Sequence, residues 1–174
     1  MFVVPSPGSS APTSPFPASV IASPSPARLG EAAERIAART ELWLPYVRFE
    51  SPDRYHTRLE RTATHEVWLL TWLPGQGTEI HGHGGSKGAF TVVRGELTER
   101  VFPPTSYPVH PVPRRLPPGP VRAFGPRLVH QVVNEGPVPA VSIHVYAPSL
   151  TSMAYYRQLP DGRLVTDRVE EVEE

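Results

Sequence analysis

Two histidines separated by one residue stand out in the sequence, within the pattern Gly75-x5-His81-x-His83. On a β-strand, alternate residues share a face, so His81 and His83 would present two imidazoles to one point. Gly82 between them leaves room for the backbone to bend around a bound ion. The spacing predicts a metal chelate, with a solvent-facing His-x-His turn as the alternative.

A third histidine follows 47 positions after His83, in His130-x3-Asn134. The segment from Gly75 to Gly95, together with His130 to Asn134, resembles the two motifs of the cupin superfamily. That resemblance implies that His81, His83 and His130 bind the metal. It also implies an all-β cupin fold, a double-stranded β-helix or jelly-roll barrel, with short N-terminal helices.

The usual cupin adds a glutamate ligand four or five residues after the second histidine, where this chain has Lys87 and Gly88. Three neutral imidazoles leave the metal with its full charge and about three open positions, enough for a bidentate anionic ligand and O2. Glu79 is the competing ligand, since alternation puts it on the face of His81 and His83. It precedes the turn into the site, which disfavours it.

Four further motifs surround the histidines: Trp72-x-Pro74-Gly75-Gln76-Gly77, Gly84-Gly85-Ser86, Gly95-Glu96-Leu97 and Ser142-x-His144-x-Tyr146. With these motifs, roughly residues 40 to 160 resemble a bacterial cysteine dioxygenase of type I. The resemblance implies a non-haem Fe(II) enzyme whose substrates are L-cysteine and O2 and whose product is cysteine sulfinate. The chain has no cysteine of its own, so any sulfur chemistry belongs to a substrate.

The resemblance also implies catalytic and substrate-binding residues. Alternation places Ser142, His144 and Tyr146 on one face, able to pass hydrogen bonds along a chain, and the family has this strand beside the iron, with Tyr146 nearest the chemistry. Without the resemblance, Tyr146 and His144 are equally well explained as satisfied core residues.

The segment Tyr55-His56-Thr57-Arg58 resembles the family motif that contains the arginine for the substrate carboxylate. A planar guanidinium fork suits that task, so Arg58 is the expected carboxylate clamp. An ordinary surface arginine is the alternative. The related dioxygenases that act on 3-mercaptopropionate usually replace this arginine with glutamine, so Arg58 favours cysteine.

One departure from the animal enzymes of the family concerns the tyrosine. They carry a cysteine that crosslinks to it, and this chain has Gly88 at that place. We therefore expect Tyr146 to be unmodified. Met153 and the Tyr146-Ala147-Pro148 turn follow the bacterial pattern, and the resemblance implies a cis peptide bond at Ala147-Pro148.

Composition narrows the classes of partner. The 174 residues include 17 Lys and Arg against 17 Asp and Glu, so the chain offers no basic field to a nucleic-acid backbone. Prolines interrupt residues 1–26 repeatedly, which predicts neither a signal peptide nor a membrane helix. We expect a cytoplasmic monomer that binds neither nucleic acid nor membrane.

The chain divides into two parts. Residues 1–28 are rich in Pro, Ser and Ala and are predicted to be a disordered tail, followed by a thiol dioxygenase domain at 29–174. An amphipathic helix is expected from Leu29 to Leu44, packed outside a sheet. Strands are expected at Glu66–Leu73, Ala89–Val93, Leu128–Val133 and Ala140–Tyr146. The nine prolines of Pro103–Pro126 predict a long excursion over the surface.

Three other functions fit the histidine motif. One is dioxygenation of 3-mercaptopropionate or another thiol, and a second is a non-catalytic cupin that senses a small ligand or a metal. The third is a zinc isomerase or hydrolase, because three histidines with an open position also suit Zn2+. Analysis of the metal in protein purified without added iron separates these alternatives best.

Overall fold

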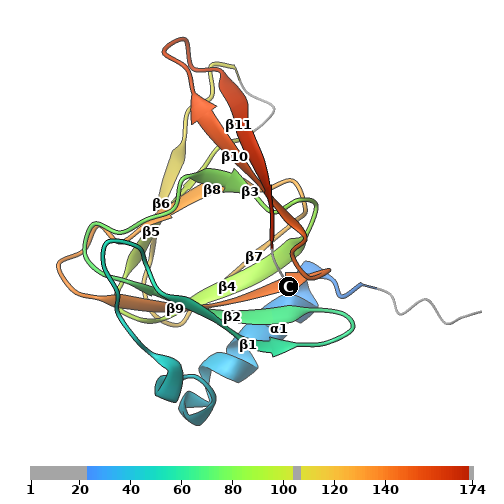
Figure 1. Cartoon of the computed structure of the whole chain (residues 1–174), viewed down its shortest axis with the longest axis vertical. Helices are drawn as coiled ribbons and strands as arrows, with labels where there is room; N and C mark the ends of the chain where they lie inside the picture. The colour runs from blue at the N-terminus through green and yellow to red at the C-terminus, as the bar shows by residue number, and fades with distance from the viewer. Residues whose placement is uncertain (1–22, 104–106, 173–174) are drawn as a thin grey trace, which may run out of the picture.

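The computed structural model describes residues 23–103 and 107–172. Two antiparallel sheets face each other across a central space (Figure 1). One sheet has the strand order β1-β2-β9-β4-β7 and the other β11-β10-β3-β8-β5-β6. The bounds of the first sheet are His56–Arg61 (β1), Glu66–Trp72 (β2), Ala140–Ala147 (β9), Lys87–Arg94 (β4) and Val121–Phe124 (β7). Those of the second are Leu164–Glu171 (β11), Ser152–Gln158 (β10), Ile80–Gly82 (β3), Val129–Val133 (β8), Leu97–Val101 (β5) and Val112–Leu116 (β6).

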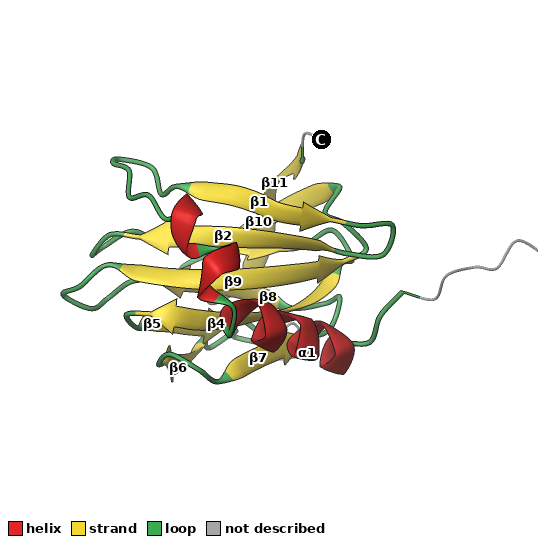
Figure 2. Cartoon of the chain, turned by 90° about the horizontal axis from the view of Figure 1, so that it is seen from below, coloured by secondary structure: helices red, strands yellow, loops and turns green. Residues whose placement is uncertain are grey.

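The five-stranded sheet is covered on its outer face by helix α1, Pro26–Ala37 (Figure 2). Strand β9 is buried along its whole length because both of its faces are covered. Its odd-numbered residues, Val141, Ile143, Val145 and Ala147, pack with Leu29, Ala32 and Ala33 of the helix. Its even-numbered residues, from Ala140 to Tyr146, point to the space between the sheets. The helix therefore packs as expected.

The helix differs in length from the prediction of Leu29–Leu44. It begins at Pro26, after Ser25, whose side chain accepts a hydrogen bond from the Arg28 amide. It ends at Ala37, where the Trp43 indole folds back and donates to the Ala37 carbonyl at 3.2 Å. Two short 3-10 turns, Thr40–Leu42 and Leu44–Tyr46, follow. The helix thus begins within the segment predicted as a tail, of which residues 1–22 lie outside the described part.

The predicted strands are confirmed in β2, β4, β8 and β9, but the proline-rich segment is not only a surface excursion. It contains β6 and β7, each at the edge of its sheet. An edge strand needs ladder hydrogen bonds on one side only, so Pro113 within β6 is tolerated. The cis peptide bond expected at Ala147–Pro148 is present.

The described residues include no helix that is long and apolar enough to cross a membrane.

Candidate metal centre

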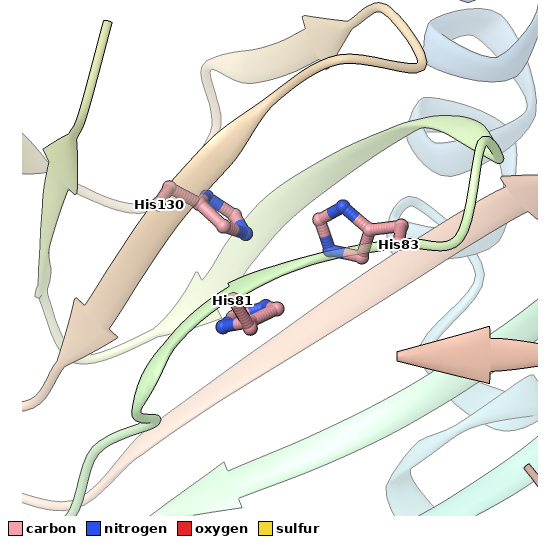
Figure 3. Close-up of side chains that lie close together, drawn as sticks. All are labelled: His81, His83 and His130. Atoms are coloured by element: carbon pink, nitrogen blue, oxygen red, sulfur yellow. The ribbon is translucent and has the colours of Figure 1, made fainter. Parts of the chain in front are cut away.

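Three buried histidines meet on the inner face of the six-stranded sheet (Figure 3). His81 lies on β3 directly opposite His130 on β8, and His83 follows β3. Their candidate ligand nitrogens lie within 4.8 Å of one another. This brings together the three residues that the motif spacing singled out.

The surroundings of each ring show which nitrogen is available to a metal. The Nδ1 of His81 lies 2.9 Å from the Glu79 carbonyl, and the Nδ1 of His130 lies 2.9 Å from the Glu99 carboxylate. Both partners accept hydrogen bonds, so both Nδ1 atoms carry a proton and each Nε2 is the nitrogen left to bind a metal. Metal-binding histidines are usually held in this way.

His83 gives the clearest sign that the cluster accommodates a metal. Both of its ring nitrogens are buried, and neither has a hydrogen-bond partner among the described residues. Buried polar atoms of this kind are costly unless something satisfies them. Its ring is held between Phe124 and Tyr146, at centroid distances of 5.0 and 5.2 Å. A metal bound by one of these nitrogens would remove the cost.

Burial also keeps His81 and His83 in the protonation state that a metal needs. Desolvation, together with the neighbouring His130, lowers the pKa of His81 from 6.5 to about 3. Desolvation and the other two histidines likewise lower the pKa of His83 well below its usual value. The imidazoles of His81 and His83 are therefore neutral at neutral pH, as metal ligands must be.

The predicted competitor, Glu79, points elsewhere. Its exposed carboxylate accepts two hydrogen bonds from Arg168, at 2.6 and 3.0 Å. The cluster that could hold a metal contains no carboxylate among the described residues.

A cavity of about 230 Å³ lies beside the histidines. His81, His130, His144, Tyr146 and Arg54 are among its lining residues. Apolar side chains form much of the remaining wall, including Leu70, Val132, Leu150 and Met153. Pockets for drug-sized ligands measure roughly 300 to 1,000 Å³, so this cavity suits a small molecule.

Ser142, His144 and Tyr146 form the expected hydrogen-bonded chain on the inner face of β9. The Ser142 Oγ lies 2.8 Å from the His144 Nε2, and the Tyr146 hydroxyl lies 3.3 Å from the His144 Nδ1. The Trp72 indole, which can only donate, bonds to Ser142 at 2.9 Å. Ser142 can therefore give its own proton to His144 Nε2, and in that tautomer the His144 proton lies on Nδ1, facing Tyr146.

Burial sets the charge states of this chain. Desolvation, and to a smaller degree the nearby Arg54, lowers the pKa of His144 well below 6.5, so the ring is neutral. Desolvation raises the pKa of Tyr146 well above 10, so the phenol keeps its proton. If Tyr146 accepts from His144, its own hydroxyl proton is free to donate into the cavity.

Arg58, the expected clamp, is not among the residues that line the cavity. Its guanidinium lies over the Trp68 ring, 5.6 Å from the centroid, and its Nη1 is 3.7 Å from the buried Glu66 carboxylate. The arginine that lines the cavity is Arg54, whose guanidinium lies 4.8 Å from the Trp72 ring centroid. The fold thus brings Arg54, in place of Arg58, to the cavity wall.

Alternation alone does not separate the two arginines. Residues 54, 56 and 58 have the same parity, and the β1–β2 register pairs His56 with Leu70 and Arg58 with Trp68. Four residues of extended chain span roughly 13 Å, and of the two arginines Arg54 is the one that lines the cavity. Arg54 was not predicted from the sequence, and neither were Trp72 and Glu99 as partners of site residues.

Glu99 is a fully buried carboxylate beside the cluster. Burial by itself raises its pKa, but the hydrogen bonds and charges of His130 and Arg122 outweigh burial and hold the pKa below 4.5. The side chain is therefore ionised at neutral pH.

Two facing antiparallel sheets with three inward histidines define a metal-binding cupin. The chain belongs to the cysteine dioxygenase type I family, whose sequence model matches residues 29–159. Membership of this family and the three-histidine cluster together indicate a metal-dependent dioxygenase.

Solved structures show the same fold at low sequence identity. The TT1209 protein of Thermus thermophilus has a TM-score of 0.53 and 24% identity over 61% of this chain and 93% of that chain. A Klebsiella pneumoniae protein with a double-stranded β-helix domain has a TM-score of 0.52 and 21% identity, over 70% of this chain and 90% of that chain. An oxalate oxidase in complex with glycolate has a TM-score of 0.52 and 16% identity, over 60% of this chain and 56% of that chain.

Proposed function

We propose that this protein is a non-haem Fe(II) thiol dioxygenase that converts L-cysteine and O2 to cysteine sulfinate. One observation carries the proposal: Arg54, Tyr146 and two histidines of the metal cluster line a single small cavity. Binding of a small thiol acid needs three groups: a cation for its carboxylate, a metal for its thiol and a hydroxyl that donates a hydrogen bond.

His81, His83 and His130 would hold the iron through one ring nitrogen each. Bound Fe(II) supplies redox chemistry with O2 and lowers the pKa of a coordinating thiol. Because all three ligands are neutral, the site favours an anionic substrate such as a thiolate.

Arg54 is the carboxylate clamp in this proposal. Desolvation lowers the pKa of its guanidinium from 12.5, because the group is withdrawn from water, yet an arginine remains charged in a protein. Among the described residues, those that raise this pKa are Tyr146 and Tyr155, and neither is a carboxylate. A substrate carboxylate would supply an anion, and the planar fork would orient the molecule along the cavity.

Tyr146 acts as a hydrogen-bond donor to the substrate or to oxygen. In this proposal the chain from Trp72 through Ser142 and His144 holds its hydroxyl in place, with the His144 proton on Nδ1 so that the phenol proton is free to donate into the cavity. The apolar wall keeps bulk water away from the reacting sulfur.

Oxygen uptake by the iron-loaded protein tests the proposal. L-cysteine should drive uptake with both atoms of ¹⁸O2 recovered in the sulfinate, and His81→Ala, His83→Ala or His130→Ala should abolish iron binding and uptake together. Faster uptake with 3-mercaptopropionate would point to that thiol instead. No uptake with any thiol, and zinc in protein purified without added metal, would contradict a dioxygenase.

A further inference from the structure

Glu99 is not one of the three candidate metal ligands, but it is a carboxylate with 0% of its surface exposed. It lies on β5, two residues before Val101, which pairs with His130 on β8. Residues on neighbouring strands in this diagonal relation lie on the same face, so Glu99 and His130 both point between the sheets. A buried carboxylate is costly unless donors satisfy both of its oxygens.

Both oxygens of Glu99 are occupied by donors. Oε1 accepts from the Nδ1 of His130 at 2.9 Å, and Oε2 accepts from the Nε of Arg122 at 2.9 Å. Arg122 lies on β7 of the opposite sheet, and it also donates from Nη1 to the Ala123 carbonyl at 2.6 Å. The series Arg122–Glu99–His130 therefore joins the two sheets and ends at the metal cluster.

The three candidate ligands differ in the hydrogen-bond partners of their ring nitrogens. His81 donates to a neutral carbonyl, His83 has no hydrogen-bond partner among the described residues, and His130 donates to an ion. A carboxylate that accepts the Nδ1 proton makes the imidazole a stronger donor and fixes its tautomer and ring plane. The usual cupin has a glutamate ligand where this chain has Lys87 and Gly88. Here a carboxylate contacts the site indirectly, through its hydrogen bond to His130.

We propose that Glu99, held by Arg122, is a positioning residue that lends negative charge to the metal through His130. This inference deepens the proposed function and rests on its metal site. A metal held by this cluster would bind more tightly than it would without the Glu99 charge, because the anion offsets part of the cation's charge. For the same reason the oxidised form of the metal would be favoured. Arg122 keeps the second oxygen engaged, so the carboxylate cannot rotate away from His130.

Glu99→Gln tests the proposal, because the amide keeps the size and one acceptor oxygen but loses the charge. Anaerobic titration with Fe(II) against a competing chelator should show affinity weakened by roughly 10- to 100-fold. The reduction potential of the bound iron should rise, a shift that a loss of fold stability alone would not cause. Glu99→Asp keeps the charge but withdraws it by one methylene, so we expect an affinity between those of the wild type and Glu99→Gln.

Glu135→Gln is the matched control, because Glu135 also pairs with an arginine, Arg100, but is exposed. It should bind iron as the wild type does. If Glu99→Gln fails to fold, Glu99→Asp tests the same link by moving the carboxylate away from His130, and its Fe(II) affinity should then lie below that of the wild type. Affinity and potential equal to the wild type in the folded Glu99 variant would overturn the inference. Failure of the wild type to bind Fe(II) would instead overturn the proposed function.

Discussion

At the scale of single residues, the two arginines near the N-terminal edge of the first sheet have different surroundings. Arg58 is the counter-charge of Glu66, a buried carboxylate whose other oxygen accepts from the Leu150 amide at 2.9 Å. Arg54 faces the cavity, where the residues that raise its pKa are two tyrosines. We infer that Arg58 supports the fold, while Arg54 is available to a substrate.

Substitution of the two arginines separates these tasks. Arg54→Ala should lower kcat/KM for L-cysteine by roughly 30- to 1,000-fold, which corresponds to about 2 to 4 kcal/mol for a partly desolvated ion pair. Iron content should not change, and turnover of cysteamine, which has no carboxylate, should be nearly unaffected. Arg54→Lys should recover only part of the loss, because an ammonium cannot form the bidentate pair.

Arg58→Lys is the control, since it keeps a cation for Glu66 without the fork. It should leave kcat/KM for L-cysteine within about threefold of the wild type. If Arg58→Lys lowers kcat/KM and Arg54→Ala does not, the clamp is Arg58 and the assignment to Arg54 is wrong.

At the scale of elements, β4 pairs with β7 and β9, the two strands whose aromatic residues contact His83. Gly88 on β4 pairs with Tyr146 on β9 and Phe124 on β7. A Cβ at this position would lie 2.6 Å from the Phe124 ring and 2.6 Å from the Val145 carbonyl. Phe124 in turn stacks on His83, with ring centroids 5.0 Å apart. The close strand approach explains a glycine here without reference to any crosslink.

Gly88→Ala should therefore be destabilising. The added methyl has no free space, and the backbone carbonyl cannot yield as a flexible side chain would, so we expect a loss of about 1 to 3 kcal/mol. Chemical denaturation of the metal-free protein measures this. Gly125→Ala is the matched control, because its Cβ would meet nothing within 4 Å. Equal stability of the two variants would show that β4 and β7 can separate at little cost.

At the scale of the whole molecule, the fold holds several neutral histidines in its interior. His81, His83 and His144 all have pKa values below 6.5 because burial disfavours the imidazolium. The unfolded chain binds protons at these positions below about pH 6.5, whereas the folded protein does not. Folding stability is therefore complete above that pH and is lost as the pH falls toward the folded-state values.

Thermal unfolding of the metal-free protein across this range measures the effect. For each pH unit below 6.5, each of these histidines should lower the free energy of unfolding by up to about 1.4 kcal/mol. The Tm should therefore fall steeply between about pH 6.5 and 4.5. His144→Gln should reduce the dependence of the unfolding free energy on pH, because unfolding then takes up one proton fewer. Bound metal should raise the Tm at neutral pH, because it binds the folded state only. A Tm independent of pH over this range would contradict the buried neutral state.

Features that depend on local spacing could be predicted from the sequence alone. His81 and His83 share a face because a strand alternates with period two, and Ser142, His144 and Tyr146 do so for the same reason. The main strands and the helix on the outer face followed from the same kind of periodicity. The motif spacing that resembles cysteine dioxygenase also led to the family that the chain was then found to belong to.

Which of several locally equivalent residues reaches the site depends on the tertiary structure. Arg54 and Arg58 have the same parity along one extended segment, and no local rule says which end of that segment meets the metal cluster. The link from Glu99 to His130 and Arg122 joins residues 31 and 23 positions apart across three strands and two sheets. Such contacts depend on sheet order and register, which are set by the packing of the whole chain and not by the periodicity of any single segment.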